Sequence, residues 1–242
     1  RDSSTSRGLG DVYKRQVQRE LIDALHRAGK KIILVNCSGS PIGLEPETQK
    51  CEAILQAWYP GQQGGKAVAE VLFGDYNPAG KLPVTFYRNV SQLPDFEDYN
   101  MTGRTYRYMQ DVPLFPFGYG LSYTTFGYGK TVLDKNELTA GQSLKLTVPV
   151  TNTGKRNGEE VVQVYLRKQG DAEGPIKTLR AFKRVSIPAG KTVNVEFDLK
   201  DKELEWWDDQ SNTVRVCPGN YDIMVGGSSK EEDLQRTTIA IK

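Results

Sequence analysis

The 242-residue sequence is poor in the residues that most often carry metal or nucleophilic chemistry, with one histidine and three cysteines. Cys37, Cys51 and Cys217 are too far apart for a Cys-x-x-Cys zinc site, and they cannot all pair with one another. Cys37 ends an apolar run, so we expect a buried, inert thiol there. His26 lies on a predicted surface helix, which argues against a Ser-His-Asp or Cys-His hydrolase site.

The sequence also lacks an excess of charge and a long apolar run. Its 32 basic and 30 acidic residues leave a net charge of +2, which gives no reason to expect a nucleic acid or an anionic membrane as partner. No apolar run approaches the roughly 20 residues that span a bilayer. Hydrophobic residues make up 38% of the chain, which is enough for a packed core.

Helix and strand patterns predict part of an α/β layered domain over residues 17–126. Residues 1–16 have no periodicity and are interpreted as an adaptor-derived or disordered tail. A helical apolar face begins at Val17 and stops at Gly29. Strands follow at residues 32–35 and 53–58, and a second helix carries Ala67 to Leu72.

Residues 74–126 are rich in proline, glycine and aromatic side chains and lose the regular period. So many aromatic residues are not typical of a solvated linker. We therefore predict an ordered segment that wraps between two domains.

From residue 127 onward apolar residues alternate with polar ones, with a period of two. Turn signals such as Asn152-Thr153-Gly154 separate the runs. The pattern predicts an antiparallel β-sandwich over residues 127–242. Trp206 and Trp207 are neighbours and should point to opposite faces of a strand. The alternating apolar positions are Leu144, Leu146, Val148, Val150, Val162, Val164, Leu166, Val193, Val195, Phe197, Leu199, Tyr221, Ile223 and Val225.

Two sequence features could indicate a catalytic or phosphate-binding site, but both are weak evidence for one. Residues 60–66 suggest a phosphate loop, but Pro60 replaces the first glycine and Ala67 replaces the Ser or Thr that would hold magnesium, so a strand-to-helix turn is expected. Glycoside hydrolysis needs two carboxyl groups, but the acidic pairs lie in polar stretches where solvated charge is the default. These pairs are Glu45/Glu47, Glu97/Asp98, Glu159/Glu160, Asp208/Asp209 and Glu231/Glu232.

Longer motifs are more specific. Residues 56–65 read QAWYPGQQGG, residues 67–86 read AVAEVLFGDYNPAGKLPVTF, and residues 114–126 read LFPFGYGLSYTTF. In this order they resemble the C-terminal half of family 3 glycoside hydrolases. Residues 160–166 (EVVQVYL) and 218–221 (PGNY) resemble the fibronectin type III-like domain of that family. The resemblance covers residues 17–242.

The resemblance implies a retaining enzyme built from a barrel, an α/β sandwich and the fibronectin-like domain. The nucleophilic aspartate lies on the barrel and the acid/base glutamate in the α/β sandwich. Both are expected upstream of Val17, and no residue of this chain matches either motif. The resemblance implies no metal and no cofactor, an oligosaccharide or glycoside as substrate, and a periplasmic or secreted location.

Residues 103–108 (GRTYRY) and 38–42 (SGSPI) resemble the β-xylosidases of the family, which indicates release of terminal β-linked xylose. Arg104 and Tyr106 are the candidate substrate-binding residues. The alternative for Arg104 is that it pins the segment to the α/β domain through hydrogen bonds to carboxylates or carbonyls. A β-glucosidase is the alternative function, and a carbohydrate-binding or structural β-sandwich module is the alternative from another class. The chain alone is expected to be inactive.

Overall fold

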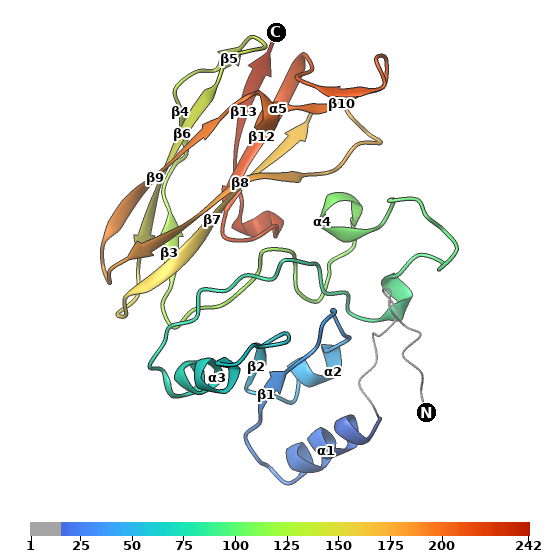
Figure 1. The fold of residues 1–242 in the computed structure, drawn as a ribbon, viewed down its shortest axis with the longest axis vertical. Coiled ribbons are helices and arrows are strands. Elements are labelled where there is room, and N and C mark those ends of the chain that lie inside the picture. Colours follow the sequence, from blue (N-terminus) through green and yellow to red (C-terminus); the bar gives the residue numbers. More distant parts are fainter. Residues whose placement is uncertain (1–15) are drawn as a thin grey trace. The chain divides into compact units, whose positions relative to one another are not determined.

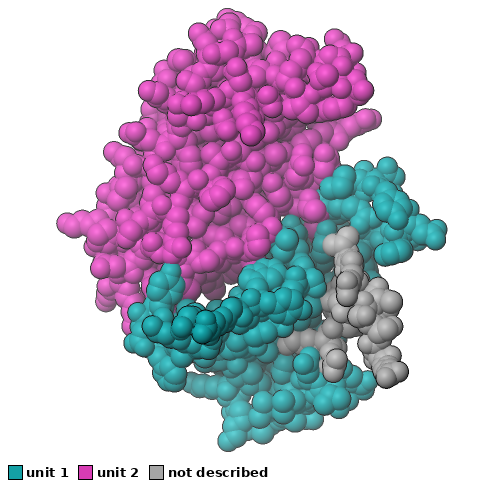
Figure 2. Space-filling view, in the orientation of Figure 1, with its two compact units in different colours: residues 1–76, 84–104, 110–116 teal, residues 77–83, 105–109, 117–242 magenta. Residues whose placement is uncertain are grey.

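The computed structural model describes residues 16–242, and its contacts divide them into two compact units, coloured separately in Figure 2. The first unit contains residues up to 76, 84–104 and 110–116. The second contains residues 77–83, 105–109 and 117–242. Apart from Gln16, the predicted tail lies outside the described residues. A domain boundary at residue 126 stays a prediction, since the second unit takes pieces from both sides of it.

The first unit alternates helices and strands. Its elements are α1 (Gln16–Arg27), β1 (Ile33–Asn36), α2 (Glu45–Thr48), β2 (Ala53–Gln56), α3 (Gly64–Phe73) and the 3-10 helix η1 (Val90–Gln92). β1 and β2 pair in parallel with Ile33 opposite Ala53, as α/β order predicts (Figure 1). Gly29 takes a φ of 66°, which confirms the predicted left-handed stop after α1. Residues 60–63 form the expected turn into α3.

Cys37 is exposed, so the prediction of a buried thiol was wrong. It follows Asn36, the last residue of β1, whose side chain is buried. Because successive side chains of an extended chain point to opposite faces, burial of Asn36 turns Cys37 outward. The apolar run predicted the strand correctly, but it did not show which way the side chain after the strand points.

The second unit is a β-sandwich preceded by the short helix α4 (Thr105–Tyr108). One sheet has the order β5-β13-β12-β7-β8. In the other, β6 pairs with β3, β4 and β9. Every pair is antiparallel except β5 with β13. The strands are β3 (Phe126–Tyr128), β4 (Val132–Leu133), β5 (Glu137–Leu138), β6 (Leu144–Asn152), β7 (Gly158–Lys168), β8 (Thr178–Ile187), β9 (Thr192–Leu199), β12 (Gly219–Gly226) and β13 (Gln235–Ile241).

Smaller elements complete this unit. α5 (Asp201–Leu204) leads into the two-stranded hairpin of β10 (Trp206–Asp208) and β11 (Thr213–Arg215). The 3-10 helix η2 (Glu231–Asp233) connects β12 to β13.

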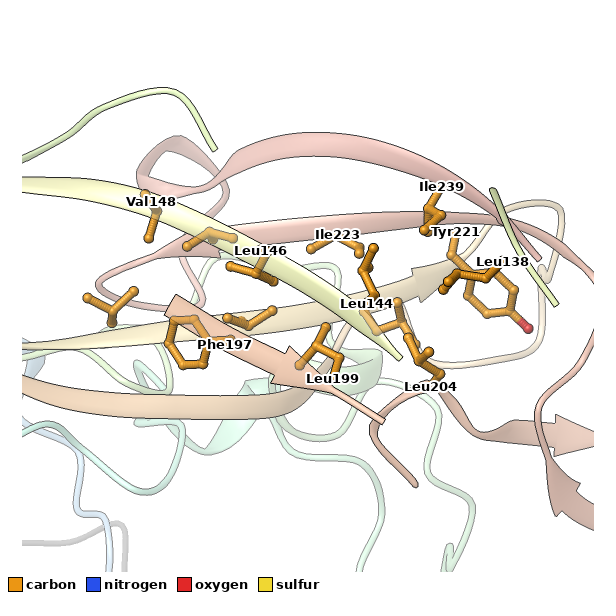
Figure 3. Packing of buried hydrophobic residues seen from close by; sticks show 14 of the residues in the cluster. Leu138, Leu144, Leu146, Val148, Phe197, Leu199, Leu204, Tyr221, Ile223 and Ile239 are labelled. Carbon is orange, nitrogen blue, oxygen red and sulfur yellow. The ribbon is translucent and has the colours of Figure 1, made fainter. Parts of the chain in front are cut away.

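The predicted alternation is confirmed in the sandwich core (Figure 3). Leu144, Leu146 and Val148 of β6 are fully buried, and they share one cluster with Leu199 of β9 and Ile223 of β12. Each such side chain contributes about 1.5–3 kcal/mol when it is removed from water. The two apolar faces therefore hold the sheets together, as the period of two requires.

A bulge adds one feature that the pattern does not contain. The β7–β8 register shifts between Val164 and Tyr165, and both Tyr165 and its neighbour Leu166 are buried. Leu166 belongs to the core cluster, whereas the ring of Tyr165 meets that of Tyr106 edge-on at 5.9 Å. Because successive side chains of a strand point to opposite faces, burial of both residues shows that both faces of β7 are covered here, one by the core and the other by Tyr106.

Candidate functional site

Arg104, the first candidate substrate-binding residue, holds a loop in place. Its Nε donates to the carbonyl of Asn100 at 2.9 Å, and its Nη2 donates to the carbonyls of Asp95 and Asp98. The Asp95 and Asp98 carboxylates accept backbone N–H groups of the same loop. A guanidinium that binds three carbonyls fixes the shape of residues 95–100.

Tyr106, the second candidate, takes part in a different network. Its ring stacks on Phe117 with centroids 4.3 Å apart, and its hydroxyl accepts the backbone N–H of Leu179 at 3.1 Å. Thr105, between the two candidates, has a φ of 54°, which is rare for a β-branched residue. The chain therefore turns sharply between Arg104, which belongs to the first unit, and Tyr106, which belongs to the second.

The carboxyl ends of β1 and β2 carry a polar cluster. Asn36 Nδ2 donates to Gln56 Oε1 at 2.6 Å and to Ser38 Oγ at 3.0 Å. Gln56 in turn donates to Ser38 Oγ. Trp58, two residues beyond β2, has a φ of 55°, and its ring packs edge-on against Phe86. Ligands of open α/β sheets bind beyond the carboxyl ends of the strands, and this polar cluster lies at that edge of the first unit.

A second polar cluster, which we call the Lys81 clamp, consists of Lys81, Tyr128 and Glu160. Lys81 Nζ lies 3.2 Å from Glu160 Oε1 and donates to the Gly120 carbonyl at 3.0 Å. The Tyr128 hydroxyl donates to the same carboxylate at 3.2 Å. All three side chains belong to the second unit. The clamp therefore fixes residues 77–83 to the sandwich.

Glu160 is only 4% exposed, so surface charge was the wrong expectation for this residue. Burial raises the pKa of its carboxyl, and the Lys81 ammonium opposes that rise. Burial and the Glu160 carboxylate raise the pKa of Tyr128. Glu47 is also buried, and Arg19 Nε lies 3.5 Å from its carboxylate. In both cases the cation comes from a distant part of the chain, which the local sequence does not show.

Close backbone packing accompanies the clamp. A Cβ on Gly120 would lie 2.2 Å from the Gly80 carbonyl oxygen, so only glycine fits there. Asn77 accepts from Ser122 and from the Tyr123 backbone, and donates to the Asn157 carbonyl. Within the second unit, residues 77–81 and 120–123 of these motifs thus bind each other, and Asn77 also binds the sandwich.

Within residues 16–242, no three His, Cys, Asp or Glu side chains are arranged to hold a metal ion. No helix in that range is long and apolar enough to cross a membrane.

The fold and the motifs together define parts of a glycoside hydrolase. Two family models match: "Glycosyl hydrolase family 3 C-terminal domain" over residues 7–123 and "Fibronectin type III-like domain" over residues 160–229. Between them they cover most of the chain. The chain belongs to glycosyl hydrolase family 3, of which it carries an α/β C-terminal domain and a fibronectin-like sandwich.

Relatives of both sugar specificities are similar to the chain. A protein named "Xylan 1,4-beta-xylosidase" from Xylanibacter ruminicola is 56% identical over 226 residues, which are 93% of this chain and 26% of that protein. A "Periplasmic beta-glucosidase" from Salmonella typhimurium is 39% identical, over 88% of this chain and 30% of that protein. The chain spans about a quarter to a third of the length of such curated relatives.

Solved structures agree with this assignment. A β-glucosidase from Erythrobacter marinus matches with a TM-score of 0.81 and 41% identity, over 93% of this chain and 30% of that one. A β-glucosidase from Listeria innocua, solved in complex with glucose, matches with a TM-score of 0.82 and 29% identity, over 95% of this chain and 33% of that one.

Proposed function

We propose that this chain is part of a retaining, exo-acting β-glycosidase that removes terminal β-linked xylose from oligosaccharides. The observation that carries the proposal is the 56% identity to a xylan 1,4-β-xylosidase over nearly the whole chain. A β-glucosidase is the second candidate, because several relatives carry that name. We place the enzyme in the periplasm or outside the cell, which the name of the Salmonella relative supports.

In this proposal the catalytic aspartate and glutamate belong to a barrel and to α/β elements that are not among the described residues. Exposed apolar side chains support the presence of further elements that pack on the first unit in the complete protein. Val17 and Leu21 of α1, Ile33 of β1 and Phe73 of α3 are all more than half exposed. Several large apolar side chains exposed on one small unit are consistent with surface that other elements of the complete protein cover.

The experiment compares the chain with the protein encoded by the complete gene. We expect the first product released from an aryl β-xyloside by the complete protein to be the β-anomer of xylose. We also expect a higher kcat/KM for the aryl β-xyloside than for the aryl β-glucoside. Proton NMR of the first product reports its anomeric form. A higher kcat/KM for the glucoside would instead support the second candidate.

The chain alone should hydrolyse neither aryl glycoside above background. A retaining mechanism needs two carboxyl groups about 5–5.5 Å apart, and neither motif that supplies them matches a position here. Turnover by the isolated chain that disappears on replacing one of its own carboxylates would contradict the proposal.

Substrate contact by Arg104 and Tyr106 stays a prediction for the complete enzyme. The three carbonyl contacts of Arg104 support a positioning role for that residue. An Arg104→Ala enzyme with a lower melting temperature but an unchanged kcat/KM would establish positioning alone. A rise in KM for xylosides at unchanged stability would establish substrate contact.

A further inference from the structure

Two arginines and a threonine of the second unit lie where α4 meets the beginning of β8. The Ile176 N–H donates to the Arg107 carbonyl at 2.7 Å, and the Leu179 N–H donates to the Tyr106 hydroxyl. These bonds hold α4 against the strand. Thr178 and Arg180 flank Leu179 in the sequence. Arg180 is the residue of β8 that is left opposite no residue of β7 at the register shift.

Three donor atoms of this cluster are unpaired. Arg107 Nε, Thr178 Oγ1 and Arg180 Nε are all buried, and within residues 16–242 none of them has a hydrogen-bond partner. Neither guanidinium forms an ion pair with a carboxylate in that range. Buried donors without partners are rare in native proteins, and each carries a desolvation cost. Three of them from two adjoining elements therefore require an explanation.

Neighbouring groups do not neutralise the two charges. Arg180 donates to the Glu205 backbone carbonyl, and its guanidinium lies 5.6 Å from the centroid of the Trp206 ring. Asp171, the carboxylate beside that ring, is already bound by Trp206 Nε1 at 2.6 Å and by the Gly174 N–H at 2.8 Å.

The pKa of Arg180 reflects this imbalance. Burial lowers it first, and the charge of Arg107 lowers it further, while the Glu205 carboxylate opposes both. The guanidinium groups of Arg107 and Arg180 therefore repel each other where both are partly removed from water.

We propose that Arg107, Thr178 and Arg180 form a binding site for an oxyanion, either a carboxylate or a phosphate. The planar edge of a guanidinium offers parallel N–H donors that match two oxygens of such a group. The Thr178 hydroxyl adds a third donor, from the same strand as Arg180. One bound anion would pair the buried donors and offset the repulsion between the two cations.

The test titrates the chain with inorganic phosphate and, separately, with glucuronate, at constant ionic strength set by sodium chloride. Calorimetry measures binding, and thermal unfolding followed by tryptophan emission measures stabilisation. We expect saturable binding, and at ten times Kd an unfolding constant lowered about elevenfold. Stronger binding of glucuronate identifies an acidic sugar as the ligand class, and stronger binding of phosphate identifies a phosphate.

Arg180→Gln and Arg107→Gln should each weaken binding at least tenfold. Arg180→Lys keeps the charge without the planar edge and should weaken binding less. Arg184→Gln is the matched control, because Arg184 lies on the same strand but pairs with Glu159, and it should bind like the parent chain. Circular dichroism confirms that each variant is folded. The proposal would be overturned if neither phosphate nor glucuronate binds saturably. It would also be overturned if binding is unchanged in both Arg107→Gln and Arg180→Gln.

Discussion

Replacing Lys81 by methionine tests the Lys81 clamp directly. Methionine keeps most of the apolar stem but removes the ammonium group that faces Glu160. The carboxylate then remains buried, with Tyr128 as its remaining side-chain donor. Removing one partner of a buried ion pair typically costs 3–5 kcal/mol, and we expect about 3 kcal/mol here because one donor remains. For a unit of this size the melting temperature should fall by on the order of 10 °C.

The loss should depend on pH. Burial already raises the pKa of Glu160, and Lys81 lowers it, so Lys81→Met should raise this pKa further. Between the unfolded and the raised folded pKa, the native state binds more protons than the unfolded state, so stability falls as pH rises. Near about pH 4 the carboxyl is protonated and no longer needs a cation. The variant should therefore lose much less free energy of unfolding at about pH 4 than at about pH 7.

Urea unfolding followed by tryptophan emission gives the free energies at the two pH values. Lys242→Met is the matched control, because Lys242 pairs with Glu137 at the exposed surface, and it should change stability by less than about 1 kcal/mol. A Lys81→Met, Glu160→Gln double variant should recover part of the loss at about pH 7. An equal loss for Lys81→Met at both pH values would refute the role assigned to the Glu160 charge.

Three further predictions concern the hairpin of β10 and β11. Trp206 is 2% exposed and Trp207 is 49% exposed, so Trp206→Ala should cost about 3–5 kcal/mol in urea unfolding, and Trp207→Ala less than about 0.5 kcal/mol. We expect no retardation of the chain by xylan or cellulose in affinity electrophoresis. Retardation that Trp207→Ala abolishes would instead support the binding-module alternative. Hydrogen bonds from Ser211 and Arg215 lower the pKa of Asp208 to about 2. Its stabilising contribution should therefore persist above the usual carboxyl pKa and disappear as pH falls through about 2. An NMR titration of the Asp208 carboxyl, with Arg215→Gln as comparison, measures this, and a normal pKa in the parent chain would contradict the assignment.

The sandwich was predictable because its signal is local. Alternation in residues 144–150 and 193–199 placed the core face of β6 and β9 correctly, since a period of two leaves one choice of face once the interior is apolar. Trp206 and Trp207 followed the same rule. The bulge was not predicted, because it depends on the register between β7 and β8, which leaves Arg180 opposite no residue of β7 and which neither strand encodes alone.

The polar sites were harder to predict because their partners are distant in the sequence. Lys81 and Glu160 lie 79 residues apart, and Tyr106 meets Leu179 across 73 residues. Each of these residues looks like an ordinary surface or turn residue in its own segment. Burial of a charge becomes acceptable only when the fold supplies the opposite charge, so the local default of solvated carboxylates failed at Glu160 and Glu47.

The clamp also bears on which sugar the enzyme prefers. The motifs in residues 77–86 and 114–126 are the most recognisable in the chain, and the structure uses Asn77, Lys81 and Gly120 to bind backbone and the sandwich. A residue that fixes backbone serves a xylosidase and a glucosidase equally well. Asn77, Lys81 and Gly120 therefore carry no information about the sugar that the proposed enzyme releases. That information must come from side chains that reach substrate. The loop shaped by Arg104 is a better place to exchange residues between relatives of the two specificities, because side chains there can change without loss of the clamp.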